Sequence, residues 1–287
     1  MNAFLFPGQG SQEVGMGKEL YEELQSARDL LNKSCEVLGY DLKELMFSGP
    51  EERLTDTCYA QPAIYTCSAM HLEKAKQEGI GFDYVAGHSL GEYSALYAAG
   101  VFSFEDGLRL VAERGEAMSA ENGKGSMAAV LGMTEEELQS YMAQGVVMAN
   151  LNTKTQIVIS GTEEGIHAVE AALPDSESVK LRMLNVSAAF HSPQMAAAAE
   201  IMRREIEQLQ FQTPTACVVC NVTARPTKDV NQIKENLISQ ITGQVRWYDS
   251  ILYMKEAGVD QFYECGNGQV LRKMNKAITL RPKCLNI

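Results

Sequence analysis

Short apolar runs alternate with longer amphipathic stretches along most of the chain, which is the pattern of strands separated by helices. Residues 3–6 and 82–86 are such apolar runs, and each is followed by a glycine-rich turn and a helical stretch. Apolar runs that lack alternating polar positions are typical of parallel strands buried on both faces. The pattern therefore predicts an α/β fold with a parallel sheet that is covered by helices on both sides.

The longer stretches have apolar residues three or four positions apart, which predicts amphipathic helices. Glycine, proline or capping residues bound most of them. Core helices are expected at residues 17–35, 41–47, 63–77, 92–99, 103–118, 194–210, 230–242, 247–257 and 270–277, and two further core strands at 217–222 and 261–264.

The pattern changes after residues 121–125, a polar and glycine-rich segment. Strands are expected at 127–131, 146–150, 156–160 and 179–186, and helices at 134–144 and 163–173. This β-α-β-β-α-β order within about 60 residues is the ferredoxin-like arrangement. We therefore expect a catalytic α/β core of residues 1–123 and 188–287 with an inserted ferredoxin-like subdomain of residues 124–187. Ligand sites are common in clefts between such units.

The strongest chemical motif is Gly87-His-Ser-Leu-Gly91, between the apolar run 82–86 and the helical stretch 92–99. A serine with glycines two positions before and after it, in a strand–turn–helix context, is the pattern of a nucleophile elbow. The sharp turn exposes the serine hydroxyl, and side chains at the glycine positions would collide with the bent backbone. Ser89 is therefore the candidate nucleophile.

A serine nucleophile needs a base, and the chain has four histidines. His71 lies among charged residues in a helical stretch and is expected at the surface, as is His167. The side chain of His88 should diverge from that of its neighbour Ser89 and support the turn. His191 lies in a loop where the chain re-enters the core, which makes it the candidate base.

Arg114 lies on the helix after the elbow helix and has two interpretations. It is either an exposed arginine paired with Glu113 or Glu116, or a bidentate clamp for a carboxylate if it points into the pocket. The residues alone leave both open.

Composition and charge exclude several classes of function. The net charge of −12 argues against nucleic acid as the main partner. No apolar run approaches the ~20 residues of a membrane span, and the N-terminus lacks the features of a signal peptide. Seven scattered cysteines and no export signal predict reduced thiols and a cytoplasmic location. Cys217 and Cys220 are expected on opposite faces of a strand, so we expect no metal site.

Five short motifs follow one another in a fixed order, at residues 6–17, 87–95, 109–115, 189–192 and 245–247. Together they resemble the malonyl-CoA:acyl-carrier-protein transacylase family of bacterial fatty-acid synthesis. The resemblance covers nearly the whole chain, and the family's fold is a hydrolase-like core with a ferredoxin-like insertion. Two loops depart from the family pattern: Gly243-Gln244 replaces Asn-Pro, and Gly266-Asn-Gly268 replaces Gly-Pro-Gly.

The resemblance implies a role for each candidate residue. Ser89 would carry the acyl group, with His191 as its base. Arg114 would hold the free carboxylate of malonate. Three further positions complete the implied site: the backbone N–H groups of Gln9 and Leu90 as the oxyanion hole, the main-chain carbonyl of Gln240 as the group that orients the histidine, and Phe190 as a substrate-selecting residue.

The activity implied is transfer of malonyl from malonyl-CoA to the phosphopantetheine thiol of acyl carrier protein, through a malonyl-serine. No cofactor is implied, because CoA and phosphopantetheine enter as parts of the substrates. Five basic residues follow the last carboxylate of the chain, Glu264, and with Lys180 and Arg182 they are candidates for contacting the acidic carrier. The five are Arg272, Lys273, Lys276, Arg281 and Lys283.

Three alternatives remain open from the sequence. A serine hydrolase or thioesterase would use the same elbow, with an acid between Ser89 and His191. A non-catalytic carrier-binding or scaffold module would need an inert Ser89. The segment Asp249-Ser-Ile251 also resembles a pantetheine attachment site, although it lies in a predicted helix of the core.

Overall fold

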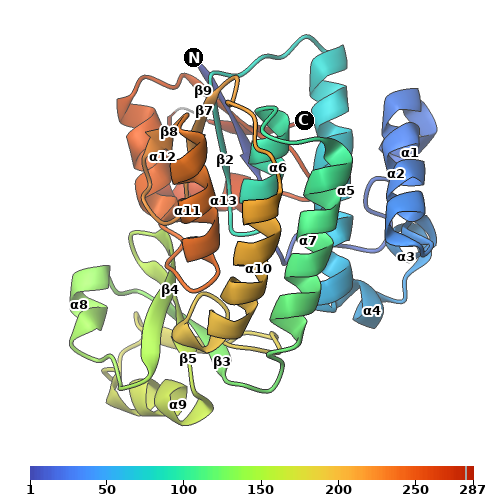
Figure 1. The fold of residues 1–287 in the computed structure, drawn as a ribbon. Coiled ribbons are helices and arrows are strands. Elements are labelled where there is room, and N and C mark those ends of the chain that lie inside the picture. Colours follow the sequence, from blue (N-terminus) through green and yellow to red (C-terminus); the bar gives the residue numbers. More distant parts are fainter. Residues whose placement is uncertain (282) are drawn as a thin grey trace.

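A computed structural model describes residues 1–281 and 283–287, and its strands form two separate sheets (Figure 1). The larger sheet has the order β10-β9-β1-β2-β7-β8, in which only the β7–β8 pair is antiparallel. Its strands are β1 (Asn2–Phe6), β2 (Tyr84–Gly87), β7 (Cys217–Val219), β8 (Pro226–Thr227), β9 (Gln261–Glu264) and β10 (Cys284–Asn286).

Both faces of this sheet are buried, as the apolar runs predict. Phe4 and Phe6 of β1 pack into the main hydrophobic cluster, whereas Ala3 and Leu5 point to the opposite face and join a second cluster around Trp247. Successive side chains of a strand alternate between faces, so a strand buried on both sides needs apolar residues at every position. The expected α/β core is confirmed.

The helices divide between these two faces. The first face is covered by α2, α5, α6, α7, α10 and α11, and the second by α12 and α13. The core helices are α1 (Lys18–Glu23), α2 (Gln25–Leu38), α3 (Leu42–Ser48), α4 (Glu51–Thr55), α5 (Thr57–Gln77), α6 (Gly91–Ala98), α7 (Phe104–Ser119), α10 (Ala196–Gln208), α11 (Val230–Gln240), α12 (Trp247–Glu256) and α13 (Val270–Ile278), with a 3₁₀ turn at Pro193–Met195.

The smaller sheet is antiparallel and has the order β4-β5-β3-β6, the strand order of a ferredoxin-like unit. It lies at the lower end of the molecule in Figure 1. Main-chain hydrogen bonds join it to the core, because Val245 donates to Ala149 and accepts from Leu151. Its elements are β3 (Ser126–Leu131), α8 (Glu135–Gln139), β4 (Val146–Thr153), β5 (Gln156–Gly161), α9 (Glu163–Ala172) and β6 (Lys180–Met183).

The two ends of this insertion lie side by side. The N–H of Gly123 donates to the carbonyl of Ser187 at 2.8 Å, and the Ser187 hydroxyl donates to Asn122 Oδ1 at 2.6 Å. The chain therefore leaves the core and returns to it at one place. The division at residues 123/124 and 187/188 stays a prediction.

Some boundaries differ from those expected. The helix expected at residues 17–35 is two helices, because the backbone of Leu24 is extended (φ −114°, ψ 121°). The helix expected to begin at residue 63 begins at Thr57 and contains Pro62. The short strands β8 and β10 were not expected, since two or three residues carry too little pattern to be recognised.

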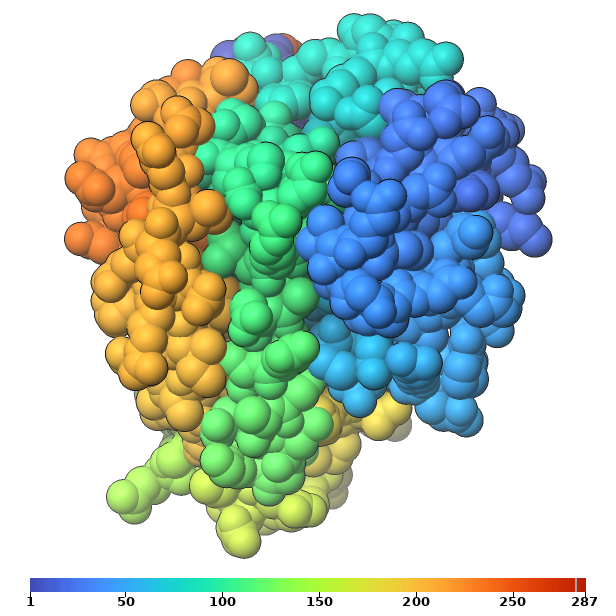
Figure 2. All heavy atoms as spheres, turned by 45° about the vertical axis from the view of Figure 1, so that its right-hand side comes forward, coloured from blue at the N-terminus to red at the C-terminus, as the bar shows by residue number. Residues whose placement is uncertain are grey.

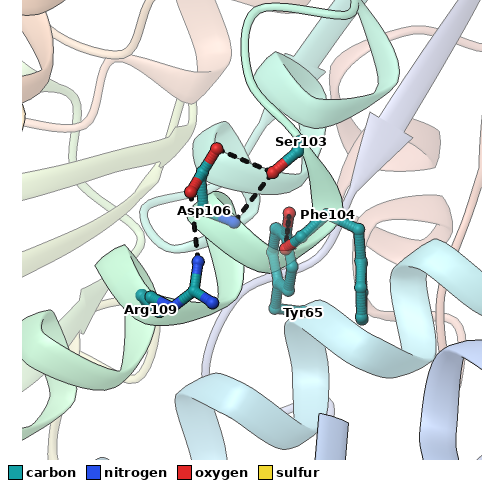
Figure 3. A network of polar contacts seen from close by, with 5 residues as sticks. All are labelled: Tyr65, Ser103, Phe104, Asp106 and Arg109. Atoms are coloured by element: carbon teal, nitrogen blue, oxygen red, sulfur yellow. Dashed lines mark hydrogen bonds and ion pairs between the residues drawn. The ribbon is translucent and has the colours of Figure 1, made fainter. Parts of the chain in front are cut away.

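Helix α7 carries Arg114, and its start is fixed by polar contacts (Figure 3). The Ser103 hydroxyl accepts from the N–H of Asp106 at 3.1 Å, which caps the helix as the sequence predicts. The buried Tyr65 hydroxyl of α5 donates to the carbonyl of Phe104 at 3.2 Å. Helix α7 is thereby held in register with α5, the longest helix of the core.

Candidate active site

Ser89 occupies a sharp turn between β2 and α6. Its φ of 51° lies in the left-handed region that residues other than glycine rarely adopt. The flanking glycines are required by contact: a Cβ on Gly87 would lie 1.8 Å from the carbonyl carbon of Gly91, and a Cβ on Gly91 would lie 2.0 Å from the carbonyl oxygen of Phe6. The turn therefore has the geometry of a nucleophile elbow.

Asn221, which follows the neighbouring strand β7, braces this turn. Its Oδ1 accepts from the N–H of Ser89 at 2.8 Å, and its Nδ2 donates to the carbonyl of Gly87 at 2.6 Å. The side chain is buried. Each polar group of one amide thus satisfies a main-chain group of the turn, which fixes the position of the serine.

His191 lies against Ser89, with its Nε2 2.7 Å from the serine Oγ. Its Nδ1 is 2.8 Å from the main-chain carbonyl of Gln240. A carbonyl only accepts, so Nδ1 carries the hydrogen of the neutral ring and Nε2 presents its lone pair to the hydroxyl. Burial, followed by the positive charge of Arg114, lowers the pKa of His191 to about 3. The ring is therefore neutral and able to accept a proton.

Arg114 points into the site and is 1% exposed. Nη1 donates to Gln61 Oε1 at 2.8 Å, and Nη2 lies 3.1 Å from both Ser89 Oγ and Gln240 Oε1. All these partners are neutral, and Nε has no hydrogen-bond partner within the described part of the chain. Burial lowers the pKa of the guanidinium, so the charge is held at a cost. The interpretation of Arg114 as an exposed arginine is wrong.

Ser89, His191 and Arg114 line a pocket of about 300 Å³. The core contributes Gln9, Leu90 and Phe190, whereas the smaller unit contributes Met127 and Asn150 from its strands. The pocket therefore lies between the two units, where the sequence places a ligand site.

The main-chain N–H groups of Gln9 and Leu90 are available to a ligand. Neither donates a hydrogen bond to any group within residues 1–281 and 283–287. Both residues line the pocket beside Ser89. The side chain of Gln9 is held by Thr57, to whose Oγ1 it donates at 3.2 Å. Two such N–H groups beside a nucleophile can stabilise a developing oxyanion.

A larger hollow of about 580 Å³ lies on another face, over α7 and between α2 and α10. Figure 2 shows this side, with α7 in green between the blue N-terminal helices and the orange α10. Its titratable lining includes Cys58, Asp106 and Glu113, but no histidine or serine. Since it holds no nucleophile–base pair, the smaller pocket is the candidate active site.

Comparison with known proteins gives the family. A family model described as an acyl transferase domain matches residues 3–264. A malonyl CoA-acyl carrier protein transacylase of Bacillus subtilis is 42% identical over 293 residues, which cover 99% of this chain and 92% of the relative. The chain belongs to the malonyl-CoA:acyl-carrier-protein transacylase family.

Other members of this transacylase family extend the comparison. The polyketide biosynthesis protein ThaF of Burkholderia thailandensis is 44% identical over 97% of this chain, which spans only 24% of ThaF. The crystal structure of an acyl-carrier-protein S-malonyltransferase from Bartonella henselae has a TM-score of 0.95 and 38% identity, covering 100% of this chain and 95% of the other.

A further solved structure holds a type II PKS acyl-carrier protein in complex with its malonyl-transacylase. Its TM-score is 0.94 at 33% identity, and the match covers 99% of this chain and 94% of that one. The expected fold of this transacylase family, with its separate antiparallel unit, is confirmed.

The structure brings the candidate catalytic and substrate-binding residues to one place. Ser89, His191 and Arg114 meet directly, and Gln9, Leu90 and Phe190 line the same pocket. The Gln240 carbonyl reaches His191 although the following loop, Gly243-Gln244, departs from the family pattern.

The structure contradicts one further prediction, for His71, and one alternative, for Ser250. His71 is half-buried rather than at the surface, because its Nδ1 is 2.5 Å from the main-chain oxygen of Ile287, a contact between distant residues. Ser250, considered as a pantetheine attachment site, is buried in α12 and donates to the Arg246 carbonyl at 2.9 Å.

Four contributions to the site were missed: Gln61, Asn221, Glu92 and the side chain of Gln240. Each is a polar residue that is almost completely buried. The sequence contains a signal for Glu92, because this carboxylate lies three positions after the nucleophile in a helix whose other residues are mostly apolar. The remaining three lie in unremarkable helical or loop sequence.

Proposed function

We propose that the chain transfers a malonyl group from malonyl-CoA to the phosphopantetheine thiol of acyl carrier protein through a malonyl-serine on Ser89. The carrier belongs to fatty-acid or polyketide synthesis. Membership of the family supports this reaction. The observation that carries the proposal is the buried guanidinium of Arg114, which lies 3.1 Å from the Ser89 Oγ and has only neutral partners.

Arg114 supplies the substrate preference. A malonyl thioester bound at Ser89 ends in a carboxylate, which would pair with the guanidinium and satisfy its free Nε donor. An acetyl group would leave the buried cation without an anion, which is unfavourable. The pocket thus selects an acyl group that carries its own negative charge.

Acylation begins with the hydrogen bond between the Ser89 hydroxyl and His191 Nε2. As Oγ attacks the thioester carbonyl, its proton passes to Nε2 and the N–H groups of Gln9 and Leu90 stabilise the oxyanion. The imidazolium then protonates the departing CoA thiolate. In the second half, the carrier thiol gives its proton to His191 and attacks the malonyl-serine. The bond to Ser89 Oγ then breaks, and the imidazolium returns the proton to Oγ, which restores the free enzyme.

The substrate also strengthens the base. The positive charge of Arg114 is one cause of the low pKa of His191. A malonyl carboxylate on the guanidinium neutralises that charge, so the pKa of His191 rises when the correct substrate is bound. Selection is therefore expected in the rate of acylation as well as in binding.

The second candidate is a hydrolase or thioesterase, which would pass the acyl group to water. The partner of His191 is a neutral main-chain carbonyl rather than the acid of a hydrolase triad. This observation favours transfer over hydrolysis.

Intact-mass measurement after incubation with malonyl-CoA tests the function. We expect one malonyl group on the wild-type protein and none on Ser89→Ala. Holo carrier protein should then remove the group much faster than water does. Absence of the adduct would contradict the proposal, and rapid hydrolysis without a carrier would support the thioesterase.

Two further points belong to the proposal. A cytoplasmic location is supported by seven cysteines that are all free, which suits a reducing compartment. Among the helices in the described part of the chain, none is long and apolar enough to cross a membrane.

Arg272 and Lys273 are exposed, as a docking surface for an acidic carrier requires. Charge reversal at both should raise the carrier KM.

A further inference from the structure

Glu92 is a buried carboxylate next to the site that the reaction described above does not use. It is the second residue of α6, three positions after the nucleophile, and is 1% exposed. Its Oε2 accepts from Gln240 Nε2 at 2.6 Å and from the N–H of Asn221 at 3.2 Å. It makes no ion pair within 4.0 Å in the described part of the chain. Its negative charge is therefore not neutralised by a cation in direct contact.

The side chain of Gln240 bridges Glu92 to Arg114. Its Oε1 accepts from Arg114 Nη2 at 3.1 Å, and its Nε2 donates to Glu92 and, at 3.0 Å, to the carbonyl of Ser89. Turning the amide over would place NH₂ against the guanidinium and oxygen against the carboxylate. The two charges therefore fix the orientation of this amide.

Gln240 is consequently in contact with all three reacting groups. Its main-chain carbonyl holds His191, its Oε1 holds Arg114, and its Nε2 holds the main chain of Ser89. Glu92 is the charged acceptor that anchors this residue. The amide also keeps the carboxylate off Arg114, which leaves the guanidinium free for the carboxylate of a substrate.

We propose that Glu92 is a positioning residue for acyl transfer. It acts through Gln240 to hold His191 and Arg114 in position against Ser89. This inference rests on the proposed malonyl transfer and adds a residue to that site.

The ionisation of Glu92 gives a readout that a purely structural role would not change. Burial raises its pKa to about 7, opposed by the hydrogen bonds from Gln240 and Asn221, the Cys220 thiol and the charge of Arg114. Tyr93, beside it on α6, has a pKa of about 12. In the free protein the pKa of Cys220 is also raised and that of His191 is about 3, so neither titrates near neutrality before the substrate binds. A step caused by His191 would persist in Glu92→Gln. Acylation should therefore speed up as the pH rises through about 7, where Glu92 loses its proton.

The experiment measures the rate of malonyl-serine formation against pH by rapid quench and intact mass. Glu92→Gln keeps the shape and removes the charge, and should slow acylation at least about tenfold at alkaline pH and abolish the step. Glu264→Gln is the matched control, since Glu264 is also buried, has a raised pKa and accepts two main-chain hydrogen bonds, from Leu271 and Arg272. It should keep the wild-type rate and step.

A second variant keeps the test decisive if Glu92→Gln folds poorly. Gln240→Met removes the amide bridge and retains the main-chain carbonyl, so it should lose the same pH step. The double variant should be no slower than the worse single variant, because both act through one contact. A wild-type step in Glu92→Gln, or additive losses, would overturn the inference. A wild-type protein that forms no malonyl-serine would instead overturn the proposed function.

Discussion

Ser89 and His191 both have a left-handed backbone, with φ values of 51° and 56°, but the chain holds them by different means. Close packing of main-chain atoms enforces the turn at Ser89, where Gly87 and Gly91 leave no room for a Cβ. The loop at His191 is held by two hydrogen bonds: His191 Nδ1 donates to the Gln240 carbonyl, and the Ser192 hydroxyl donates to the Ala189 carbonyl. The nucleophile is thus fixed by steric contacts and the base by hydrogen bonds. Substitutions are expected to disturb these two kinds of contact to different degrees.

The largest effect is expected where packing enforces the turn. Gly91→Ala would force its Cβ to within 2.0 Å of the Phe6 carbonyl oxygen, so the strand–helix junction must open. We expect the free energy of unfolding to fall by more than about 3 kcal/mol and acylation to be lost. Denaturant unfolding measures the first. Gly81→Ala is the control, because a Cβ there meets nothing within 4 Å. Equal stability of the two variants would contradict this account of the turn.

Removing the base tests the other half of the comparison. His191→Ala should fold normally and slow the formation of malonyl-serine by about 10²- to 10⁴-fold. His167→Ala should act as wild type, since that residue is exposed and its side chain is hydrogen-bonded to Glu170, away from the site. Single-turnover acylation is the measurement. A small loss in His191→Ala would assign the base elsewhere.

Arg114 serves the substrate, so its loss should depend on which substrate is offered. Arg114→Ala should lower kcat/KM for malonyl-CoA by about 10²-fold or more, because it removes the cation that pairs with the substrate carboxylate. Preference should shift towards acetyl-CoA. Arg109→Ala is the matched control, as an exposed arginine on the same helix that pairs with Asp106. If the ratio of kcat/KM for malonyl-CoA to that for acetyl-CoA did not change, the guanidinium would not be the group that binds the substrate carboxylate.

The smallest effect should come from loosening the histidine loop without touching the ring. The buried Ser192 Oγ lies 2.5 Å from the Ala189 carbonyl oxygen and 2.6 Å from Gln194 Oε1. Ser192→Ala should cost about 1 kcal/mol of unfolding free energy and slow acylation about threefold. Thermal unfolding and the acylation rate check both values. A loss as large as that of His191→Ala would mean that this one hydroxyl alone holds the loop.

The same contrast explains what the sequence could reveal. A turn enforced by sterics needs glycine at fixed positions, so the motif around Ser89 is visible in the chain. A loop held by hydrogen bonds has no such requirement, and His191 was found only by elimination and family resemblance. Arg114 stayed ambiguous because a pattern of helical positions does not tell a core-facing cation from an exposed one. Gln240 could be assigned a carbonyl from the family, but the role of its side chain depends on contacts with residues up to 151 positions away.

The fold is easier to predict from the sequence than the site, and the features of the fold that were not predicted have a common cause. Strands buried on both faces and amphipathic helices leave strong periodic signals, as β1 and α7 illustrate. The strand β10 has three residues and pairs with β9 through long-range contacts, so nothing local marks it. The break at Leu24 is a single extended residue inside an otherwise continuous helical pattern.

The hydrogen bond between Gly123 and Ser187 has an evolutionary consequence. Because the chain leaves the core and returns to it at adjacent residues, a gene can gain or exchange residues 124–187 in one event without rerouting any core strand. We propose these boundaries for the inserted unit on that basis. The exchanged segment would bring a new pocket wall, including Met127 and Asn150, while Ser89 and His191 stayed in place. A replacement of this segment would therefore alter the shape of the acyl pocket and leave the contacts between Ser89 and His191 as they are.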